Sequence, residues 1–315
     1  MISRILQLAT FGIVLSAASC AFTFAHFGLY TLATVGASLI LFFYALVLAV
    51  EFALLAIVGR RGGDPHGCAS PTAVEMMRAW IGEVAGTPIV FCWQQPFRST
   101  AEPDLLEVRG SAARGVVLVH GFLCNRGFWN PWMRKLRGSG IPYVAVTING
   151  PFSSISDGAA AIESGVRRLE AATGQRPVIV AHSMGGLAVR WWLAERSAGC
   201  RVHRVITIGS PHRGTWLARF SHTTNGKQMR LSSSWIADLV ARETTSTYAM
   251  FTCFFGSCDN VVFPTWTAVL PGAECRSVPA TAHVQMAYHP AVLQEVLHWV
   301  RLDPISGDLA AMQRN

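Results

Sequence analysis

The sequence VIVAHSMGG at residues 178–186 carries the strongest structural signal in the chain. Its apolar first half predicts a buried strand, and residues 184–195 have the pattern of a helix. Ser183 would therefore lie in a sharp turn between a strand and a helix, as in a nucleophile elbow. Such a turn brings the strand and the helix close together, so the residues two before and two after the Ser must be small. Ala181 and Gly185 meet this requirement, and Ser183 is the predicted nucleophile.

An alternative interpretation of the stretch is an ordinary strand-to-helix turn capped by a Ser. Strings of this kind occur by chance in a chain rich in Gly and Ala, and the usual elbow has Gly where this chain has Ala181. One extra methyl group still meets the steric requirement. The position of Ser183 between an apolar strand and an amphipathic helix favours the elbow. The start of that helix would direct the backbone amide of Met184 toward a developing oxyanion.

Short apolar runs alternate with helix-like segments through the region that surrounds this stretch. Such alternation predicts a mostly parallel, doubly wound sheet of the α/β class, with helices on both faces. Asp157 is the predicted N-cap of the helix over 157–172. The predicted strands are 116–120, 143–148, 177–181, 205–208, 249–255 and 276–278, and the other predicted helices are 129–137, 184–195 and 291–300.

A Ser hydroxyl needs a general base, which is itself oriented by a carboxylate. In a fold with this elbow the chain order is Ser, then acid, then His. His283 lies in a loop of small residues between the last strand and the last helix, so it is the predicted base, and His289 remains the alternative. His298 falls within the last helical pattern. The remaining histidines after the Ser come too early to follow an acid on a later strand; they are His203, His212 and His222.

The acid is expected directly after the strand that precedes the base. Asp259 follows the apolar run at 249–255, which places it at the carboxyl end of a strand, where active sites of open α/β sheets form. Its alternative role is that of a turn Asp bonded to its own backbone. Asp238 and Glu243 fall in a helix-like segment, and Glu274 precedes the next strand. The sequence therefore favours Asp259.

The second donor of an oxyanion hole usually comes from a loop after an earlier strand. The run at 116–119 ends in His120, Gly121 and Phe122, and the Gly allows that loop to fold back toward the Ser. The predicted oxyanion donors are therefore the amides of Phe122 and Met184. We expect His120 to have a structural hydrogen-bonding role in the loop.

Composition narrows the function classes. Apolar residues make up 51% of the 315 residues and charged residues only 14%, with a net charge of +8. The basic residues are scattered singly or in pairs, so the charge does not indicate nucleic-acid binding and instead favours an anionic membrane surface. None of the eight cysteines forms a CxxC pair, so we expect no zinc site and no metal or other cofactor. Buried, reduced cysteines are favoured over disulfides.

The first 59 residues form two apolar runs, at 5–25 and at 29–50, and the second continues to 58. Each is long enough for a helix across a bilayer, which needs about 20 residues. The connection between them is short, which predicts a helical hairpin as the membrane anchor. One span preceded by an interfacial helix is the alternative. Residues 60–75, rich in Gly and Pro, form the predicted linker.

Positive residues indicate the orientation of this anchor. Arg4 precedes the first run and Arg60 and Arg61 follow the second, so both ends of a hairpin would lie on the cytoplasmic side. Residues 17–20 weakly match the cleavage box of a lipoprotein signal peptide, which is the main alternative. The second apolar run would remain after cleavage, so a membrane location is expected in either case.

The predicted site resembles that of lipases and esterases of the α/β-hydrolase superfamily, in particular bacterial triacylglycerol lipases. The shared segments are HGF at 120–122, AHSMGG at 181–186 and GSPHRGT at 209–215, together with Asp259 and His283. The resemblance implies an α/β-hydrolase domain, which the sequence pattern places at 76–303, followed by a tail at 304–315. The two apolar runs are not part of the common lipase pattern, and they predict a location in the bacterial inner membrane. The resemblance also implies a lid at 216–248, for which packing into the core is the alternative.

The expected function is therefore hydrolysis of a carboxylic ester, such as a lipid, through an acyl-enzyme on Ser183. Two alternatives remain open. An acyltransferase would use the same three residues and pass the acyl group to an alcohol other than water. A hydrolase-like domain without activity would serve as a tethered scaffold. The expected partners are an ester substrate and the lipid bilayer.

Overall fold

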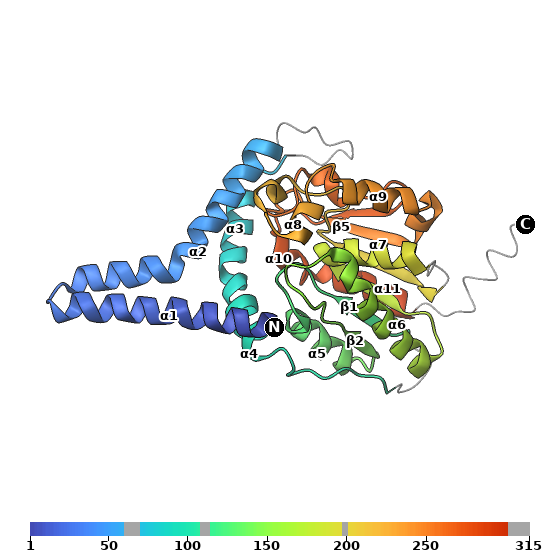
Figure 1. Cartoon of the computed structure of the whole chain (residues 1–315), viewed down its shortest axis with the longest axis horizontal. Helices are drawn as coiled ribbons and strands as arrows, with labels where there is room; N and C mark the ends of the chain where they lie inside the picture. Colours follow the sequence, from blue (N-terminus) through green and yellow to red (C-terminus); the bar gives the residue numbers. More distant parts are fainter. Residues whose placement is uncertain (60–69, 108–113, 197–200, 302–315) are drawn as a thin grey trace, which may run out of the picture.

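The computed structural model describes residues 1–59, 70–107, 114–196 and 201–301. It consists of a helical hairpin that projects from an α/β domain, with a long helix between the two (Figure 1). Residues 60–69 of the expected linker and residues 304–315 of the expected tail lie outside the described part of the chain.

A parallel six-stranded sheet forms the centre of the domain, in the order β2-β1-β3-β4-β5-β6. The strands are β1 (Val116–Val119), β2 (Tyr143–Ala145), β3 (Val178–His182), β4 (Arg204–Ile208), β5 (Phe251–Phe255) and β6 (Glu274–Ser277). Every neighbouring pair is parallel, so the predicted α/β fold class is confirmed. The chain adds β2 on one side of β1 and all later strands on the other side. Open α/β sheets form their binding sites at such a switch point, which here lies at the carboxyl ends of β1 and β3.

Helices cover both faces of this sheet because side chains alternate along each strand. Val117 and Val119 of β1 pack in one core with α6 (Ala159–Thr173) and α7 (Met184–Arg196). Their neighbours Val116 and Leu118 pack in a second core with α5 (Asn130–Gly138) and α11 (Pro290–Arg301). The continuous apolar runs in the sequence therefore correspond to strands that are buried on both faces.

The predicted N-cap at Asp157 is wrong. Residues Ile155–Gly158 form a short 3-10 helix, η3, and α6 begins after Gly158, which makes no side-chain cap bond. The backbone amide of Asp157 instead donates to Ser154 O in that turn. A side chain at Gly158 would lie 3.0 Å from Ile148 Cδ1, so tight packing selects a Gly at the helix start.

Helix α3 (Ala73–Pro88) is not among the helices predicted from the sequence. It begins at a capping box formed by Thr72 and Glu75. It continues through a π-helical turn, η1 (Ile89–Gln94), into α4 (Gln95–Phe97). The helix lies between the hairpin and the α/β domain (Figure 1), where it packs against α10 (His283–Met286). Its position links the N-terminal helices to the loop that follows β6.

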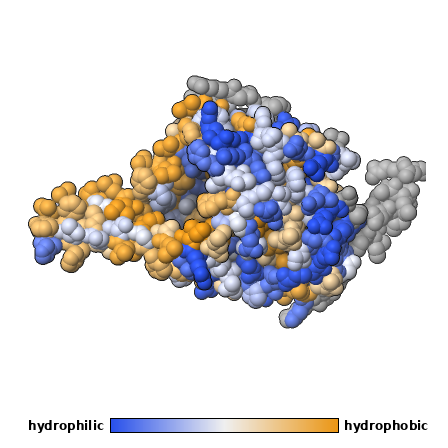
Figure 2. Space-filling model, viewed as in Figure 1, coloured by the Kyte–Doolittle hydropathy of each residue, from blue (hydrophilic) through white to orange (hydrophobic). Residues whose placement is uncertain are grey.

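The hairpin consists of α1 (Ile2–His26) and α2 (Tyr30–Gly59), both of which are long and apolar enough to cross a membrane by length and composition. Figure 2 shows hydrophobic residues over most of its visible surface, with a hydrophilic spot at the tip. The base of α1 is fixed to the domain, since Gln7 Nε2 donates to Pro96 O at 2.8 Å. Near the end of α2, Phe52 and Leu55 are buried in a cluster with Ala79 of α3 and residues of the domain.

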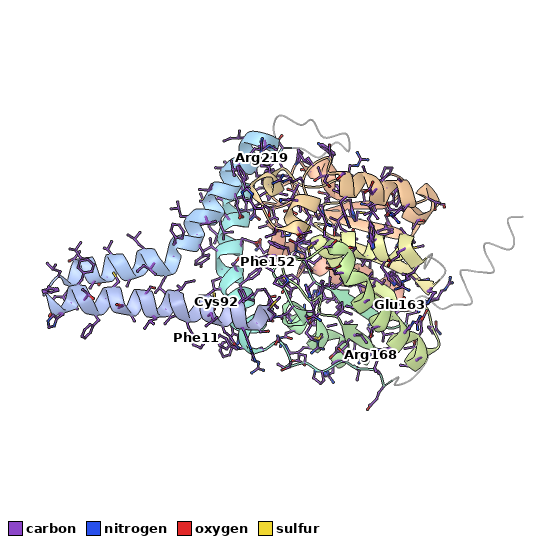
Figure 3. The ribbon with its side chains drawn as sticks, in the orientation of Figure 1. Phe11, Cys92, Phe152, Glu163, Arg168 and Arg219 are labelled. Carbon is purple, nitrogen blue, oxygen red and sulfur yellow. The ribbon has the colours of Figure 1, made fainter. Side chains whose placement is uncertain are left out.

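Charged side chains gather on the opposite end of the molecule. Glu163 accepts hydrogen bonds from Arg201 Nη1 at 2.9 Å and from Trp192 Nε1 at 2.8 Å, and Arg168 binds Asp104 at 2.8 Å. Figure 3 shows Glu163 and Arg168 on α6, away from the hairpin that carries Phe11. The protein is therefore amphipathic along its length.

Residues 216–248 form η5 (Trp216–Phe220), α8 (Thr224–Gln228), α9 (Ser234–Arg242) and the start of η6 (Thr245–Met250). A buried ion pair attaches this segment to α7. Arg190 Nε lies 2.8 Å from Glu243 Oε1, and Arg190 Nη1 donates to His212 O at 2.7 Å. Leu239 is fully buried in the core. The last part of the segment is therefore packed firmly against the domain.

We predict that Glu243→Ala lowers the free energy of unfolding by about 3 kcal/mol, because it leaves the guanidinium of Arg190 buried without its partner. Thermal unfolding of the detergent-solubilised protein measures this loss. Glu195→Ala is the control, since Glu195 makes an exposed ion pair with Arg196 that contributes less than about 1 kcal/mol. Equal melting temperatures of the two variants would contradict the prediction.

Candidate active site

Ser183 lies between β3 and α7 with a backbone φ of 54°, a left-handed conformation that is strained for a residue with a side chain. Its amide donates to Ile208 O at 2.9 Å, which ties the turn to the end of β4. A Cβ at Gly185 would lie 2.6 Å from His120 O. Only Gly fits there, as expected from the short distance between strand and helix at this turn.

The loop after β1 passes directly against this turn. A Cβ at Gly121 would lie 2.8 Å from the Cβ of Ser183, so the loop can approach the Ser only because residue 121 is a Gly. Phe122 follows this Gly and lines a cavity together with Ser183. Met184 is the first residue of α7. Both residues expected to supply oxyanion donors are therefore neighbours of Ser183 in space.

Asp259 and His283 form a buried pair. The Nδ1 atom of His283 lies 3.0 Å from both carboxylate oxygens of Asp259. Asp259 Oδ1 also accepts the backbone amides of Val261 at 2.9 Å and Val262 at 2.8 Å, which fix the carboxylate in place. The two residues are 24 positions apart in sequence, and the structure brings them together as the sequence predicts for an acid and a base.

Gly209, at the end of β4, provides the space for this pair. Its φ is 52°, and a Cβ on it would lie 2.8 Å from Asp259 Oδ2 and 3.1 Å from His283 Nδ1. The segment GSPHRGT at 209–215 therefore begins with a Gly for a steric reason. Asp259 and His283 lie beside the carboxyl ends of β4 and β5.

His283 also contacts the residue that precedes Ser183. The rings of His182 and His283 have centroids 4.6 Å apart, and His182 Nε2 lies 3.1 Å from His283 O. The hydroxyl of Ser183 makes no hydrogen bond to any residue in the described part of the chain. Catalytic hydrogen bonds are often long in a structure without substrate and tighten when substrate binds. Ser183, Asp259 and His283 thus occupy one edge of the sheet.

Electrostatics distinguish His283 from its neighbours. Burial opposes protonation of its imidazole, but the charge of Asp259 and the hydrogen bond to it outweigh this effect and raise the pKa of His283 above 6.5. Burial lowers the pKa of His182 well below 6.5, and nearby His283 lowers it further. A His with a raised pKa beside a carboxylate is suited to accept a proton.

The other candidate histidines have structural roles. His120 Nδ1 lies 2.9 Å from Gly121 O, while its Nε2 accepts the amide of Ile148 at 3.0 Å; burial lowers its pKa to about 4. His289, the alternative base, accepts the amide of Ala291 at the start of α11. The structure therefore pairs Asp259 with His283 and not with His289.

The cavity beside Ser183 has a volume of about 160 Å³. It extends from the hydroxyl under the segment at 216–248, and its wall includes Leu217, Ala218 and Met229 from that segment and Val262 from the Asp259 loop. Among the described residues, no group of three or more His, Cys, Asp or Glu side chains could hold a metal ion. The site offers an apolar chamber next to the hydroxyl-bearing Ser183.

Three polar residues near His283 were missed by the sequence analysis as parts of the site. Asn260 Oδ1 accepts the backbone amide of His283 at 3.2 Å. Glu83 accepts the amides of the next two residues, and Glu51 binds Asn260. Glu83 and Glu51 lie 200 or more residues before His283 in the sequence, on helices outside the sheet, and no local motif marks them.

Comparison with known proteins agrees with this fold. The mature lipase of Bacillus licheniformis superposes with a TM-score of 0.51 at 16% identity, covering 61% of this chain and 93% of that chain. Lipase B of Aspergillus fumigatus gives a TM-score of 0.52 at 19% identity, covering 63% of this chain and 56% of that chain. No curated protein sequence matches this chain. The model of the alpha/beta hydrolase family matches residues 116–315, and the chain therefore belongs to the alpha/beta hydrolase family.

Proposed function

We propose that this protein is a membrane-anchored serine hydrolase that cleaves carboxylic esters through an acyl-enzyme on Ser183. The observation that carries the proposal is the buried Asp259–His283 pair beside a strained Ser at the mouth of an apolar cavity. A Ser, a His and an Asp in this arrangement catalyse acyl transfer in proteins of unrelated sequence, because the reaction depends on the relative positions of the three side chains.

In the proposed reaction, His283 Nε2 takes the proton of Ser183 as the Oγ atom attacks the ester carbonyl. Asp259 binds Nδ1–H and so keeps Nε2 free to accept that proton. The amides of Met184 and Phe122 donate to the oxyanion of the tetrahedral intermediate. His283 then protonates the leaving alcohol. A water attacks the acyl-enzyme with His283 again as base, which releases the acid and restores Ser183.

The substrate class follows from the cavity and the hairpin. The cavity wall at Leu217, Ala218 and Met229 suits an acyl chain and offers no charged partner to an ionic group. Most of the large apolar side chains that are exposed in the described part of the chain lie on the hairpin of α1 and α2, and a contiguous exposed apolar surface marks an interaction site. We propose that the hairpin inserts into a lipid bilayer and that the substrate is a lipid or another amphiphilic ester found there.

The proposed topology is a hairpin in a bacterial inner membrane with the hydrolase domain in the cytoplasm. Both ends of the hairpin adjoin the domain, since Gln7 near the start of α1 and Phe52 near the end of α2 contact it. Arg4 lies at the same end, as expected for the cytoplasmic side. The proposed division of the chain is an anchor at 1–59, a linker at 60–75, a hydrolase domain at 76–303 with a lid at 216–248, and a tail at 304–315.

We expect Ser183→Ala and His283→Ala each to lower kcat for a p-nitrophenyl ester by at least about 10⁴-fold, because each removes one member of the proton-transfer unit. His289→Ala is the matched control and should keep nearly full kcat. Near-full activity of His283→Ala, with loss in His289→Ala, would identify His289 as the base. An active Ser183→Ala variant would exclude the proposed nucleophile.

The pH dependence follows from the raised pKa of His283. The imidazole must be neutral to accept the Ser183 proton, so kcat/KM should fall as the pH drops through a pKa that lies above 6.5. Asp259→Asn removes the main anion that favours imidazolium, so the acidic limb of the profile should move to lower pH and kcat should fall about 10⁴-fold. An acidic limb at the same pH in Asp259→Asn and in the wild type would contradict the assignment of Asp259 as the acid.

The cavity predicts how activity depends on acyl length. Ala218→Leu adds bulk to its wall, so we expect the variant to lose activity on longer p-nitrophenyl esters and keep it on the acetate. Val240→Leu is the control, because Val240 is exposed on α9. Hydrolysis of a series of chain lengths measures both variants. If Ala218→Leu lowers all rates equally, the acyl chain does not occupy this cavity. Turnover only with an added alcohol acceptor would favour acyl transfer.

A further inference from the structure

The loop that carries His283 is held by side chains from outside the hydrolase sheet. We propose that Glu83 of α3 and Glu51 of α2 are positioning residues, which hold His283 toward Asp259 and stabilise its imidazolium form. The inference rests on the proposed function, since it concerns the base of that reaction. It implies that the active site is complete only when the N-terminal helices are docked on the domain.

Glu83 makes the direct attachment. Its Oε1 accepts the amide of Val284 at 2.9 Å and its Oε2 accepts the amide of Gln285 at 3.1 Å. These amides belong to the two residues that follow His283. The Glu83 side chain is buried, with 2% exposure. Because both carboxylate oxygens are used, the backbone after His283 is fixed in distance and in orientation relative to α3.

Glu51 acts through Asn260. Glu51 Oε2 accepts a hydrogen bond from Asn260 Nδ2 at 2.6 Å, and Asn260 Oδ1 accepts the backbone amide of His283 at 3.2 Å. Asn260 directly follows Asp259 in the chain. One amide side chain therefore connects α2 to both members of the acid–base pair, and Glu51 fixes which way that amide points.

A buried carboxylate is a costly means of fixing a loop. Burial raises the pKa of Glu83 to about 7, although the amides of Val284 and Gln285 and the nearby His283 oppose this rise. A neutral side chain could accept hydrogen bonds with a smaller desolvation penalty. At a pH above its pKa Glu83 is ionised, and its negative charge then has a function beside His283, because that ring becomes positive each time it accepts the Ser183 proton.

The charged groups around His283 determine in which direction the loss of Glu83 or Glu51 shifts the pKa of His283. Asp259, Glu83 and Glu51 favour the charged form of His283, while burial disfavours it. His182 packs against the ring, with centroids 4.6 Å apart, and has a pKa well below 6.5. The charge of Glu83 also acts on Tyr288, whose pKa is raised chiefly by burial. Removing the charge of Glu83 or Glu51 therefore lowers the pKa of His283. A loss of folded enzyme alone would lower kcat without moving the acidic limb of the pH profile.

The test compares Glu83→Gln and Glu51→Gln with Glu75→Gln in the full-length protein in detergent. Glu75 is only partly buried, at the start of α3, and Gln can keep its capping bond to Thr72, so it controls for the same chemical change on the same helix. We expect Glu83→Gln to lower kcat about tenfold with KM changed less than twofold, and the acidic limb of kcat/KM to move to lower pH. Glu51→Gln should move the limb in the same direction, and Glu75→Gln should match the wild type.

The outcomes separate this inference from the proposed function. An active wild type whose acidic limb is unchanged in both Glu83→Gln and Glu51→Gln overturns the positioning role alone. A wild type that hydrolyses no ester overturns the proposed function. In that case NMR titration of His283, assigned by its absence in His283→Ala, still decides the inference. A lower His283 pKa in Glu83→Gln than in Glu75→Gln supports it, and equal pKa values contradict it.

Discussion

The left-handed turn at Ser183 imposes the constraint on which the site depends. The chain leaves β3 and enters α7 within one residue, so the helix start lies against the loop after β1 and the end of β4. Each close approach requires a residue without a side chain, at Gly185 and Gly121. The strain of the turn is retained because β3 is buried on both sides in the middle of the sheet. The rigid sheet therefore places one buried Ser beside the cavity at the switch point of the strand order.

Asp259 and His283 lie in the segments that follow β5 and β6, outside the sheet. The hydrogen bonds of the sheet do not hold these segments, so other contacts must fix them. Asp259 is fixed by two amides of its own loop, and His283 is fixed by Asp259, by Asn260 and by the contact with His182. The proposed roles of Glu83 and Glu51 add attachments from α3 and α2. Through these roles, docking of the N-terminal hairpin and the charge state of His283 would be coupled by a chain of only a few hydrogen bonds.

Local pattern was sufficient to predict the sheet and the three residues that the structure brings to its edge. Apolar runs indicate buried strands, and the requirement for small residues around Ser183 is steric and therefore visible in the sequence. The order Ser, acid, His narrowed the choice to Asp259 and His283. Asp157 was predicted wrongly as a helix cap because residues Ile155–Gly158 form a 3-10 turn ahead of α6, which places Asp157 inside that turn. Glu83 could not be found from the sequence, since its role depends on a contact between segments 200 residues apart.

Covalent labelling of the solubilised protein with a fluorophosphonate tests the central claim most directly. Such a reagent reacts with a Ser only when a base and an oxyanion hole activate it. The account predicts one adduct per chain, located by peptide mass spectrometry on Ser183, with no adduct in Ser183→Ala and a rate reduced by orders of magnitude in His283→Ala. An adduct on another residue, or labelling of Ser183 at an undiminished rate in His283→Ala, would contradict it.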